Sequence, residues 1–213
     1  QPDDTFEENH VKDMQQKMDQ EEKPTTGEKI STIDLLTPAM PATISEMTVE
    51  YTSWTNWFYA EPVDNPTAPA VILIHEWWGL NDHIKDMARI LAKNGYKALA
   101  VDLYKGQVAD NMETAKTLSS SLVQDEATAN LLAAEAYLRT KTNKVASLWR
   151  CLGGKQSLQL SLESDTLDAT IIYYGRLTGD ATTLQNINEP ILWIFAENDS
   201  WIPPSAVAEF EQG

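Results

Sequence analysis

The stretch that decides the fold is Ala70–Asp102, AVILIHEWWGLNDHIKDMARILAKNGYKALAVD. It contains two continuous apolar runs, Ala70–His75 and Tyr96–Val101, and such runs are typical of strands buried on both faces of a sheet. Between them, Asp82–Asn94 carries apolar residues at helical spacing and stops at Gly95. A strand, a helix and a strand in this order predict a βαβ unit.

The alternation of strands and helices continues along the chain. Further strands are expected at Lys144–Leu148, Ala169–Tyr174 and Pro190–Phe195. Helices are expected at Gln124–Thr142, at Lys155–Leu162 and from Pro203 onward. Upstream, a segment rich in Thr, Trp, Tyr and Phe predicts an early antiparallel strand or hairpin arm at Glu50–Ala60. The whole pattern predicts an α/β fold in one domain, residues 44–213, with a mostly parallel sheet and helices on both faces.

The first part of the chain has a different composition. Residues 1–30 are polar and acidic and contain almost no large apolar side chains, so they cannot bury enough surface to offset the entropy lost on ordering. We therefore expect residues 1–43 to form an acidic, largely flexible arm. A short helix around Val11–Met18 is the alternative for part of it.

The charge of the chain narrows the class of partner. Its 16 basic and 32 acidic side chains give a formal net charge of −16. Nucleic acids are bound through Lys and Arg, and the sequence shows no basic patch, so we expect no nucleic-acid partner. No apolar run approaches the roughly 18 residues of a membrane span, so we expect no membrane-spanning segment. A homodimer is compatible with the sequence, although nothing in it requires a second copy.

The single cysteine, Cys151, excludes an internal disulfide framework but says little about compartment. The chain begins at Gln1 without a signal-peptide pattern, so we expect that a leader was removed or that the sequence was trimmed. An exported location, periplasmic or secreted, is preferred, and the cytoplasm is the alternative.

The residues that carry chemistry follow the predicted strands. In a parallel sheet, ligands bind at the carboxyl ends of the strands. The loops to search are therefore His75–Gly79, Asp102–Lys105, Leu148–Gly154, Tyr174–Arg176 and Ala196–Trp201. No His, Cys, Asp or Glu cluster has metal-ligand spacing, and no glycine-rich phosphate loop is present, so neither a metal nor a cofactor is expected.

One of these loops predicts a nucleophile. Cys151 lies between a predicted strand and a predicted helix, where a strained turn requires small residues around the nucleophile. Gly153 supplies one small position, and Gly154 lets the helix pack close to the strand. A helix N-terminus beside the sulfur would lower the pKa of the thiol. The alternative for a lone cysteine is an inert core residue.

Three segments together resemble the dienelactone hydrolase family of α/β-hydrolases. Val145–Gly154 is similar to its Gly-x-Cys-x-Gly-Gly signature, Ile74–Asn81 to its glutamate–aromatic–Gly–x–Asn loop, and Gly95–Tyr104 to its Gly-Tyr…Asp-Leu-Tyr strand. The segments Tyr173–Gly175 and Pro190–Asp199 follow in the expected order, so the resemblance covers roughly residues 71–204.

The resemblance implies a reaction and a set of catalytic residues. Cys151 would attack an ester or lactone and form an acyl-enzyme that water then hydrolyses. Glu76 would lie beside the thiol and help to control its protonation, and Asp199 would orient a histidine. The alternatives are an exposed strand-end carboxylate for Glu76 and a turn or capping residue for Asp199.

Further residues would bind the substrate. By the same resemblance, the backbone N–H groups of Trp77 and Leu152 would form the oxyanion hole. Tyr104 and Trp78 are candidates to line the acyl pocket, although ordinary packing explains such aromatic residues equally well. His75 is a rival base, but its position at a strand end favours a structural role.

Several features depart from the family pattern. Trp149 stands where a small residue is expected and should clash with the turn, which leaves a distorted turn, an inactive enzyme or an error in the sequence as explanations. Arg150 follows where an aromatic residue is usual, and Lys155 where a small one is common.

Two other departures concern the histidine and the substrate. No histidine follows Asp199, so we expect the catalytic one beyond Gly213. No arginine lies between Arg89 and Arg139 to bind a dienelactone carboxylate, which favours a different ester. The leading hypothesis is a small-molecule ester or lactone hydrolase, and the alternative is a catalytically inactive binding or surface protein. A serine esterase is disfavoured, because no serine occupies the turn.

Overall fold

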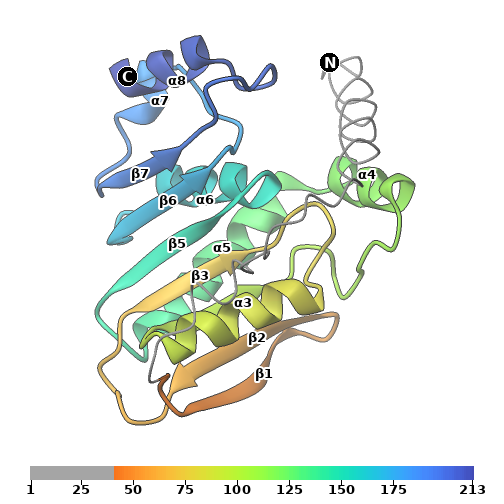
Figure 1. Ribbon diagram of the computed structural model, residues 1–213, viewed down its shortest axis with the longest axis vertical. Helices are drawn as coiled ribbons and strands as arrows, with labels where there is room; N and C mark the ends of the chain where they lie inside the picture. Colours follow the sequence, from red (N-terminus) through yellow and green to blue (C-terminus); the bar gives the residue numbers. More distant parts are fainter. Residues whose placement is uncertain (1–40) are drawn as a thin grey trace, which may run out of the picture. The chain divides into compact units, whose positions relative to one another are not determined.

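The computed structural model describes residues 41–213, so the predicted arm lies outside the described residues except for its last three positions. Within 41–213, seven strands form one sheet in the order β1-β2-β4-β3-β5-β6-β7 (Figure 1). The strands are β1 (Ile44–Thr52), β2 (Thr55–Pro62), β3 (Ala70–Ile74), β4 (Lys97–Val101), β5 (Val145–Arg150), β6 (Ala169–Tyr173) and β7 (Ile191–Ile194).

The sheet is mostly parallel. Strands β1 and β2 form an antiparallel hairpin, and β2 pairs antiparallel with β4. All other pairs, from β4 through β3, β5 and β6 to β7, are parallel. This arrangement confirms the predicted α/β fold and the early hairpin arm, which is longer than the predicted Glu50–Ala60. Where the arm was predicted to end, Ala42 N–H donates to the carbonyl of Lys93 at 3.0 Å.

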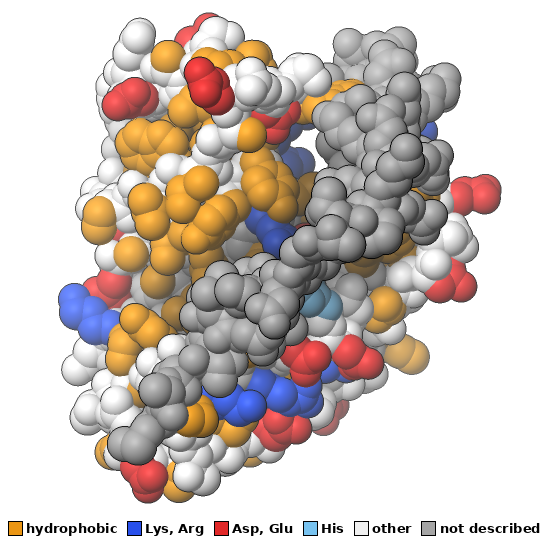
Figure 2. Space-filling model, in the orientation of Figure 1, with side chains coloured by type: hydrophobic (Ala, Val, Ile, Leu, Met, Phe, Trp, Pro, Cys, Tyr) orange, Lys and Arg blue, Asp and Glu red, His pale blue; other side chains and the backbone are white. Residues whose placement is uncertain are grey.

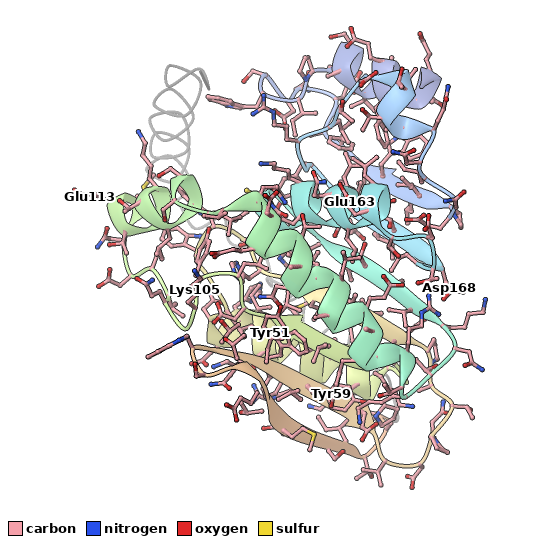
Figure 3. All side chains as sticks on the ribbon, turned by 180° about the vertical axis from the view of Figure 1, so that it is seen from behind. Tyr51, Tyr59, Lys105, Glu113, Glu163 and Asp168 are labelled. Carbon is pink, nitrogen blue, oxygen red and sulfur yellow. The ribbon has the colours of Figure 1, made fainter. Side chains whose placement is uncertain are left out.

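Helices cover both faces of the sheet, as predicted. Helix α3 (Asp82–Lys93) covers one face, and α5 (Gln124–Arg139) and α6 (Leu152–Glu163) cover the other (Figures 1 and 3). The last helix is α8 (Pro204–Gln212). Helix α6 begins at Leu152, directly after Cys151, which is three residues earlier than the predicted Lys155.

Two helices were not predicted. Helix α4 (Met112–Ser120) has a polar sequence of which only Ala115 and Leu118 are buried, so the apolar periodicity is weak. The Asn111 side chain caps it by accepting from Thr114 N–H. Helix α7 (Ala181–Leu184) is a single turn.

The core beneath α3 sets the position of the β3–α3 loop. Asn81 caps α3 by accepting from Ile84 N–H at 3.2 Å, and Ile84 and Ala88 are buried against strands β2, β3 and β4. The loop between β3 and α3 is therefore fixed at both ends.

Strands β6 and β7 are less covered on the face that α3 covers elsewhere. Leu192 and Ile194 of β7 are exposed, and their register partners on β6 are Ile171 and Tyr173. Tyr173 is exposed as well, and Figure 2 shows an apolar area on the face of the molecule that is turned to the viewer.

Candidate active site

The backbone at Cys151 has the strained conformation expected of a nucleophile turn. Its φ of 54° and ψ of −125° are rare for a residue with a side chain. Its N–H donates to the carbonyl of Tyr173, and its carbonyl accepts from Lys155 N–H in the first turn of α6, each at 3.1 Å. Cys151 therefore links the end of β5 to the start of α6 in a fixed geometry.

Close packing of two glycines enforces this geometry. A Cβ built on Gly153 would lie 2.1 Å from the carbonyl oxygen of Ile74, and one on Gly154 would lie 2.9 Å from Cα of Gly175. Neither position has room for a side chain, so small residues are required at both positions after Cys151, as predicted. The packing also places the start of α6 directly against the end of β3.

The predicted clash of Trp149 with the turn is wrong. Trp149 is buried and belongs to the apolar cluster that contains Leu80 and Ile84 near the start of α3. Its ring centre lies 6.5 Å from that of His83 on α3. The protein therefore accommodates the large side chain in its core while Cys151 keeps the strained turn.

Charged and titratable side chains lie around Cys151. The Nε of Arg150 donates to the carboxylate of Glu76, and its Nη2 lies 3.3 Å from Nε2 of His83. Tyr174, whose φ is 37°, interacts electrostatically with Arg150, Glu76 and Cys151. The predicted Glu76 is thus placed beside Cys151. In the sequence, Arg150 was recognised only as a departure from the family pattern. Its ion-pair partner Glu76 lies 74 residues away, and no local sequence pattern indicates this pairing.

Burial dominates the ionisation of the thiol. It raises the pKa of Cys151, and the negative charge of Glu76 acts in the same direction. The Leu152 N–H group and the positive charge of Arg150 lower this pKa but do not overcome burial. As expected, the N–H group at the helix N-terminus lowers the thiol pKa. The pKa of Cys151 is nevertheless raised overall, because burial has the larger effect.

The predicted oxyanion donors both lie next to this group. Leu152 follows Cys151 directly, and Trp77 follows Glu76. Within residues 41–213, neither N–H group donates to a backbone carbonyl. The ring of Trp77 packs edge-on against that of Trp78, with ring centres 5.1 Å apart. The Leu152 N–H group interacts with the Cys151 thiol, and Trp77 follows Glu76, whose carboxylate also acts on that thiol.

His75 has a structural role. It is fully buried, its Nε2 accepts from Leu103 N–H at 3.0 Å, and its Nδ1 lies 2.5 Å from the carbonyl of Glu76. These contacts assign the ring proton to Nδ1. Burial lowers the pKa of His75 to about 4, so the ring is neutral at pH 7. Tyr104, predicted for the acyl pocket, is buried with its ring centre 4.6 Å from that of His75.

Asp199 lies in the loop after β7. Its Oδ1 accepts from the N–H groups of Trp201 at 2.8 Å and Ile202 at 3.1 Å, so the carboxylate organises its own turn. Within the described part of the chain, no hydrogen bond or ion pair joins Asp199 to Cys151 or Glu76.

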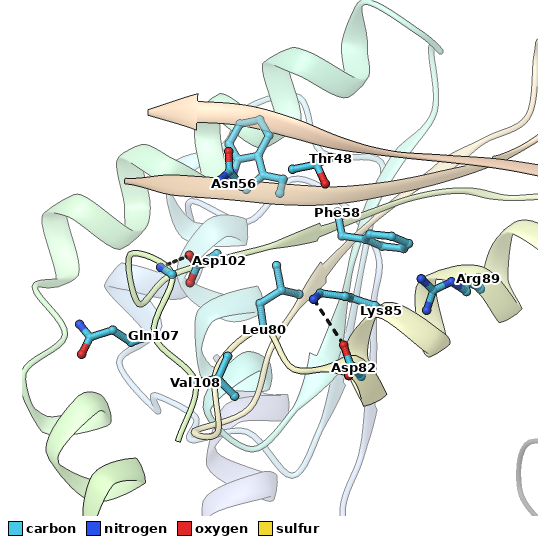
Figure 4. Close-up of a pocket in the computed structure, with 12 residues that line it drawn as sticks. Thr48, Asn56, Phe58, Leu80, Asp82, Lys85, Arg89, Asp102, Gln107 and Val108 are labelled. Atoms are coloured by element: carbon cyan, nitrogen blue, oxygen red, sulfur yellow. Dashed lines mark hydrogen bonds and ion pairs between the residues drawn. The ribbon is translucent and has the colours of Figure 1, made fainter. Parts of the chain in front are cut away.

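A cavity of about 410 Å³ opens beside the β1–β2 hairpin, the start of α3 and the loop after β4 (Figure 4). Its wall includes Lys85 of α3 and the buried Asp102. Cys151 does not line it, and neither do the predicted pocket residues Trp78 and Tyr104. The cavity is therefore separate from the group of side chains around the nucleophile.

Two further structural features concern metals and membranes. Among residues 41–213, no three or more His, Cys, Asp or Glu side chains are arranged to hold a metal ion. No helix in this part of the chain is long and apolar enough to cross a membrane.

The fold and the strained turn at Cys151 define an α/β-hydrolase. A sequence model of the Dienelactone hydrolase family matches residues 57–213. The chain belongs to the dienelactone hydrolase family.

Relatives and solved structures agree with this assignment. The protein usf of Aquifex pyrophilus is 33% identical over an alignment of 145 residues that covers 63% of this chain and 63% of its own. This chain therefore spans less than two thirds of that relative. A Saccharolobus solfataricus protein, named as a candidate carboxymethylenebutenolidase, is 32% identical over 67% of this chain and 70% of its own. The crystal structure of a dienelactone hydrolase-like promiscuous phosphotriesterase from metagenomic libraries has a TM-score of 0.69 and 25% identity, covering 79% of this chain and 77% of its own.

Proposed function

We propose that this protein hydrolyses carboxylic esters or lactones of small molecules with Cys151 as the nucleophile. The observation that carries the proposal is the surroundings of Cys151: its left-handed turn, which close glycine packing enforces between β5 and α6, lies beside the ion pair of Glu76 and Arg150. Strain of this kind costs about 1 to 3 kcal/mol and persists where the surrounding structure imposes it, often at active sites. Membership of the dienelactone hydrolase family supports the same chemistry.

The first half of the proposed reaction forms an acyl-enzyme. The thiolate of Cys151 attacks the carbonyl carbon, and a C–S bond forms while the carbonyl oxygen takes the negative charge. The N–H groups of Leu152 and Trp77 donate to this oxygen. The C–O bond of the ester then breaks, and the leaving alkoxide takes up a proton. In a lactone, the alcohol stays attached to the acyl group.

The second half releases the product. Water attacks the thioester carbonyl, the C–S bond breaks, and a carboxylic acid leaves as the thiolate is restored. The proton released in this step balances the one that the leaving alkoxide takes from solvent in the first half. In this proposal Glu76 exchanges a proton with the thiol, and Asp199 orients the base that activates the water. His75 is not that base, because both of its ring nitrogens are engaged in buried hydrogen bonds. His83 contacts Arg150 and Trp149 instead of Asp199.

Ester turnover and thiol reactivity test the proposal together. The full chain is incubated with a short-chain p-nitrophenyl ester and, separately, with a small lactone. We expect turnover that Cys151→Ala lowers by about 10³-fold or more, and an acyl adduct on Cys151 in the intact mass of a stopped reaction. Absence of turnover with both the ester and the lactone would refute the proposal, and the rate of alkylation of Cys151 by iodoacetamide shows separately whether the thiol is reactive.

One observation favours a second candidate, a hydrolase-fold protein that binds ligands without catalysis. The raised pKa of Cys151 keeps the thiol in its less reactive form at neutral pH. Under this alternative, wild type and Cys151→Ala bind the same ester with equal affinity and release no nitrophenol. A difference in turnover between the two proteins excludes it.

A further inference from the structure

The side chain of Arg150 is held in place beside the nucleophile. It precedes Cys151 directly, and its Nε donates to the Glu76 carboxylate. Its Nη2 contacts Nε2 of His83 at 3.3 Å, and its guanidinium carbon lies 5.4 Å from the centre of the Trp149 ring. The contacts come from the loop after β3, from α3 and from β5, so they fix a half-exposed side chain from several directions.

The partner that Arg150 binds is the carboxylate that opposes ionisation of the thiol. Glu76 raises the pKa of Cys151, whereas Arg150 lowers it. Within residues 41–213, no hydrogen bond joins the Glu76 carboxylate to Sγ of Cys151, and its oxygen Oε1 is bound to Arg150 instead. The carboxylate and the guanidinium therefore act in opposite directions on the ionisation of one thiol.

We propose that Arg150 is a positioning residue for Cys151: its guanidinium holds the Glu76 carboxylate in place and offsets its charge beside the thiol. This inference rests on the proposed function, in which Cys151 is the nucleophile. The charged and titratable groups around the sulfur are Glu76 after β3, Arg150 on β5 and Tyr174 after β6, and His83 of α3 borders Arg150. Loss of Arg150 leaves the carboxylate beside the thiol without a counter-charge, which disfavours the thiolate.

The rate of alkylation of Cys151 by iodoacetamide, measured against pH, reads out this effect in the full chain. Arg150→Gln should raise the midpoint of the profile by about one pH unit, which corresponds to up to a tenfold slower reaction near neutral pH. Arg150→Lys keeps the charge but loses the planar fork, so a smaller rise is expected. Arg89→Gln is the matched control, because Arg89 binds Glu46 on the surface of the hairpin and should not alter the profile.

A double-mutant cycle tests whether Arg150 acts through Glu76. Glu76→Gln alone should lower the midpoint, and Arg150→Gln should shift it in that background by less than half of its effect in wild type. Equal shifts in both backgrounds, or no difference between Arg150→Gln and Arg89→Gln, would overturn the proposal. Thermal unfolding identifies a variant that fails to fold, and Arg150→Lys then carries the comparison.

The readout also separates this inference from the proposed function. Alkylation requires a reactive thiol but no ester turnover. A wild-type protein that hydrolyses no ester, yet shows the expected shifts in its alkylation profile, refutes the proposed function and supports the role of Arg150. If the protein hydrolyses the ester but its alkylation profile does not respond to Arg150→Gln, the proposed function is supported and the role of Arg150 is refuted.

Discussion

Within residues 41–213, three residues other than glycine have a left-handed backbone, and two of them, Lys105 and Cys151, lie in turns that are held by different means. Lys105, after β4, has a φ of 55°, and Cys151, after β5, has a φ of 54°. The Lys105 turn is held by a side chain, because the Asp102 carboxylate accepts from the N–H groups of Tyr104 at 2.8 Å and Gly106 at 2.5 Å. The Cys151 turn is held by backbone packing at glycines.

The comparison shows that an unusual backbone conformation alone does not mark a reactive residue. The Lys105 side chain is exposed and pairs with Glu126 at the surface. Cys151 lies instead among Glu76, Arg150 and the N–H group of Leu152. The neighbours of the side chain, rather than φ, distinguish the candidate nucleophile from an ordinary turn residue.

The largest expected difference between the turns concerns their glycines. Gly153→Ala places a Cβ against the carbonyl of Ile74 and should cost about 3 to 4 kcal/mol of unfolding free energy, together with activity. In Gly106→Ala the nearest atom would be 3.6 Å away, so only left-handed strain of about 1 kcal/mol is expected. Urea unfolding of both variants provides the measurement. Equal losses would show that packing does not hold the Cys151 turn.

The second difference concerns His75, which connects the two loops through Leu103 and Glu76. Burial lowers its pKa from 6.5 to about 4, so between these values the unfolded chain binds a proton that the folded protein does not. Unfolding free energy should therefore be independent of His75 above pH 6.5 and fall by about 3 kcal/mol as the pH drops to 4. Urea unfolding at several pH values tests this. His75→Gln should flatten the dependence and the exposed His83→Gln should not, and a flat wild-type curve would contradict it.

The third prediction addresses the side chain that holds the Lys105 turn. Asp102→Ala leaves two N–H groups without their acceptor and should cost about 2 kcal/mol. Alkylation of Cys151 should stay at the wild-type rate, because the turn after β5 does not depend on this carboxylate. Chemical denaturation and the alkylation assay measure the two effects. A changed alkylation rate would mean that the Cys151 turn depends on Asp102 as well as on the packing of its glycines.

The smallest effect is expected at Lys105 itself. Lys105→Gly relieves the left-handed strain but increases the freedom of the unfolded chain, and the exposed ion pair contributes little. Unfolding free energy should therefore rise by about 0.5 kcal/mol or less, without any effect on ester turnover. Cys151→Gly relieves similar strain and should abolish turnover. A loss of turnover in Lys105→Gly would show that the Lys105 turn also contributes to catalysis, which contradicts its interpretation as an ordinary surface turn.

Much of the fold could be predicted because its signals are local. Strands β3 and β4 are continuous apolar runs, and α3 has apolar spacing and a capping asparagine. The signals are weak where the structure differs from prediction. Helix α4 buries only two side chains, and α6 begins with Leu152, Gly153 and Gly154, of which the glycines are poor helix formers.

The candidate site could be predicted only as far as the strand order allows. The strand ends bring Glu76 to the neighbourhood of Cys151, and the roles of Trp77 and Leu152 as oxyanion donors remain predictions. The ion pair of Arg150 and the burial of Trp149 depend on contacts between segments far apart in the sequence, which no periodicity encodes. The links proposed for Asp199 remain predictions.

The packing of α6 against β3 also bears on how such a site changes over evolutionary time. The backbone conformation at residue 151 is imposed by Gly153, Gly154 and their neighbours, and not by the sulfur atom. A hydroxyl can therefore replace the thiol there without rebuilding the turn. The fold therefore sets the position of residue 151, and a single substitution there would exchange a sulfur atom for an oxygen atom.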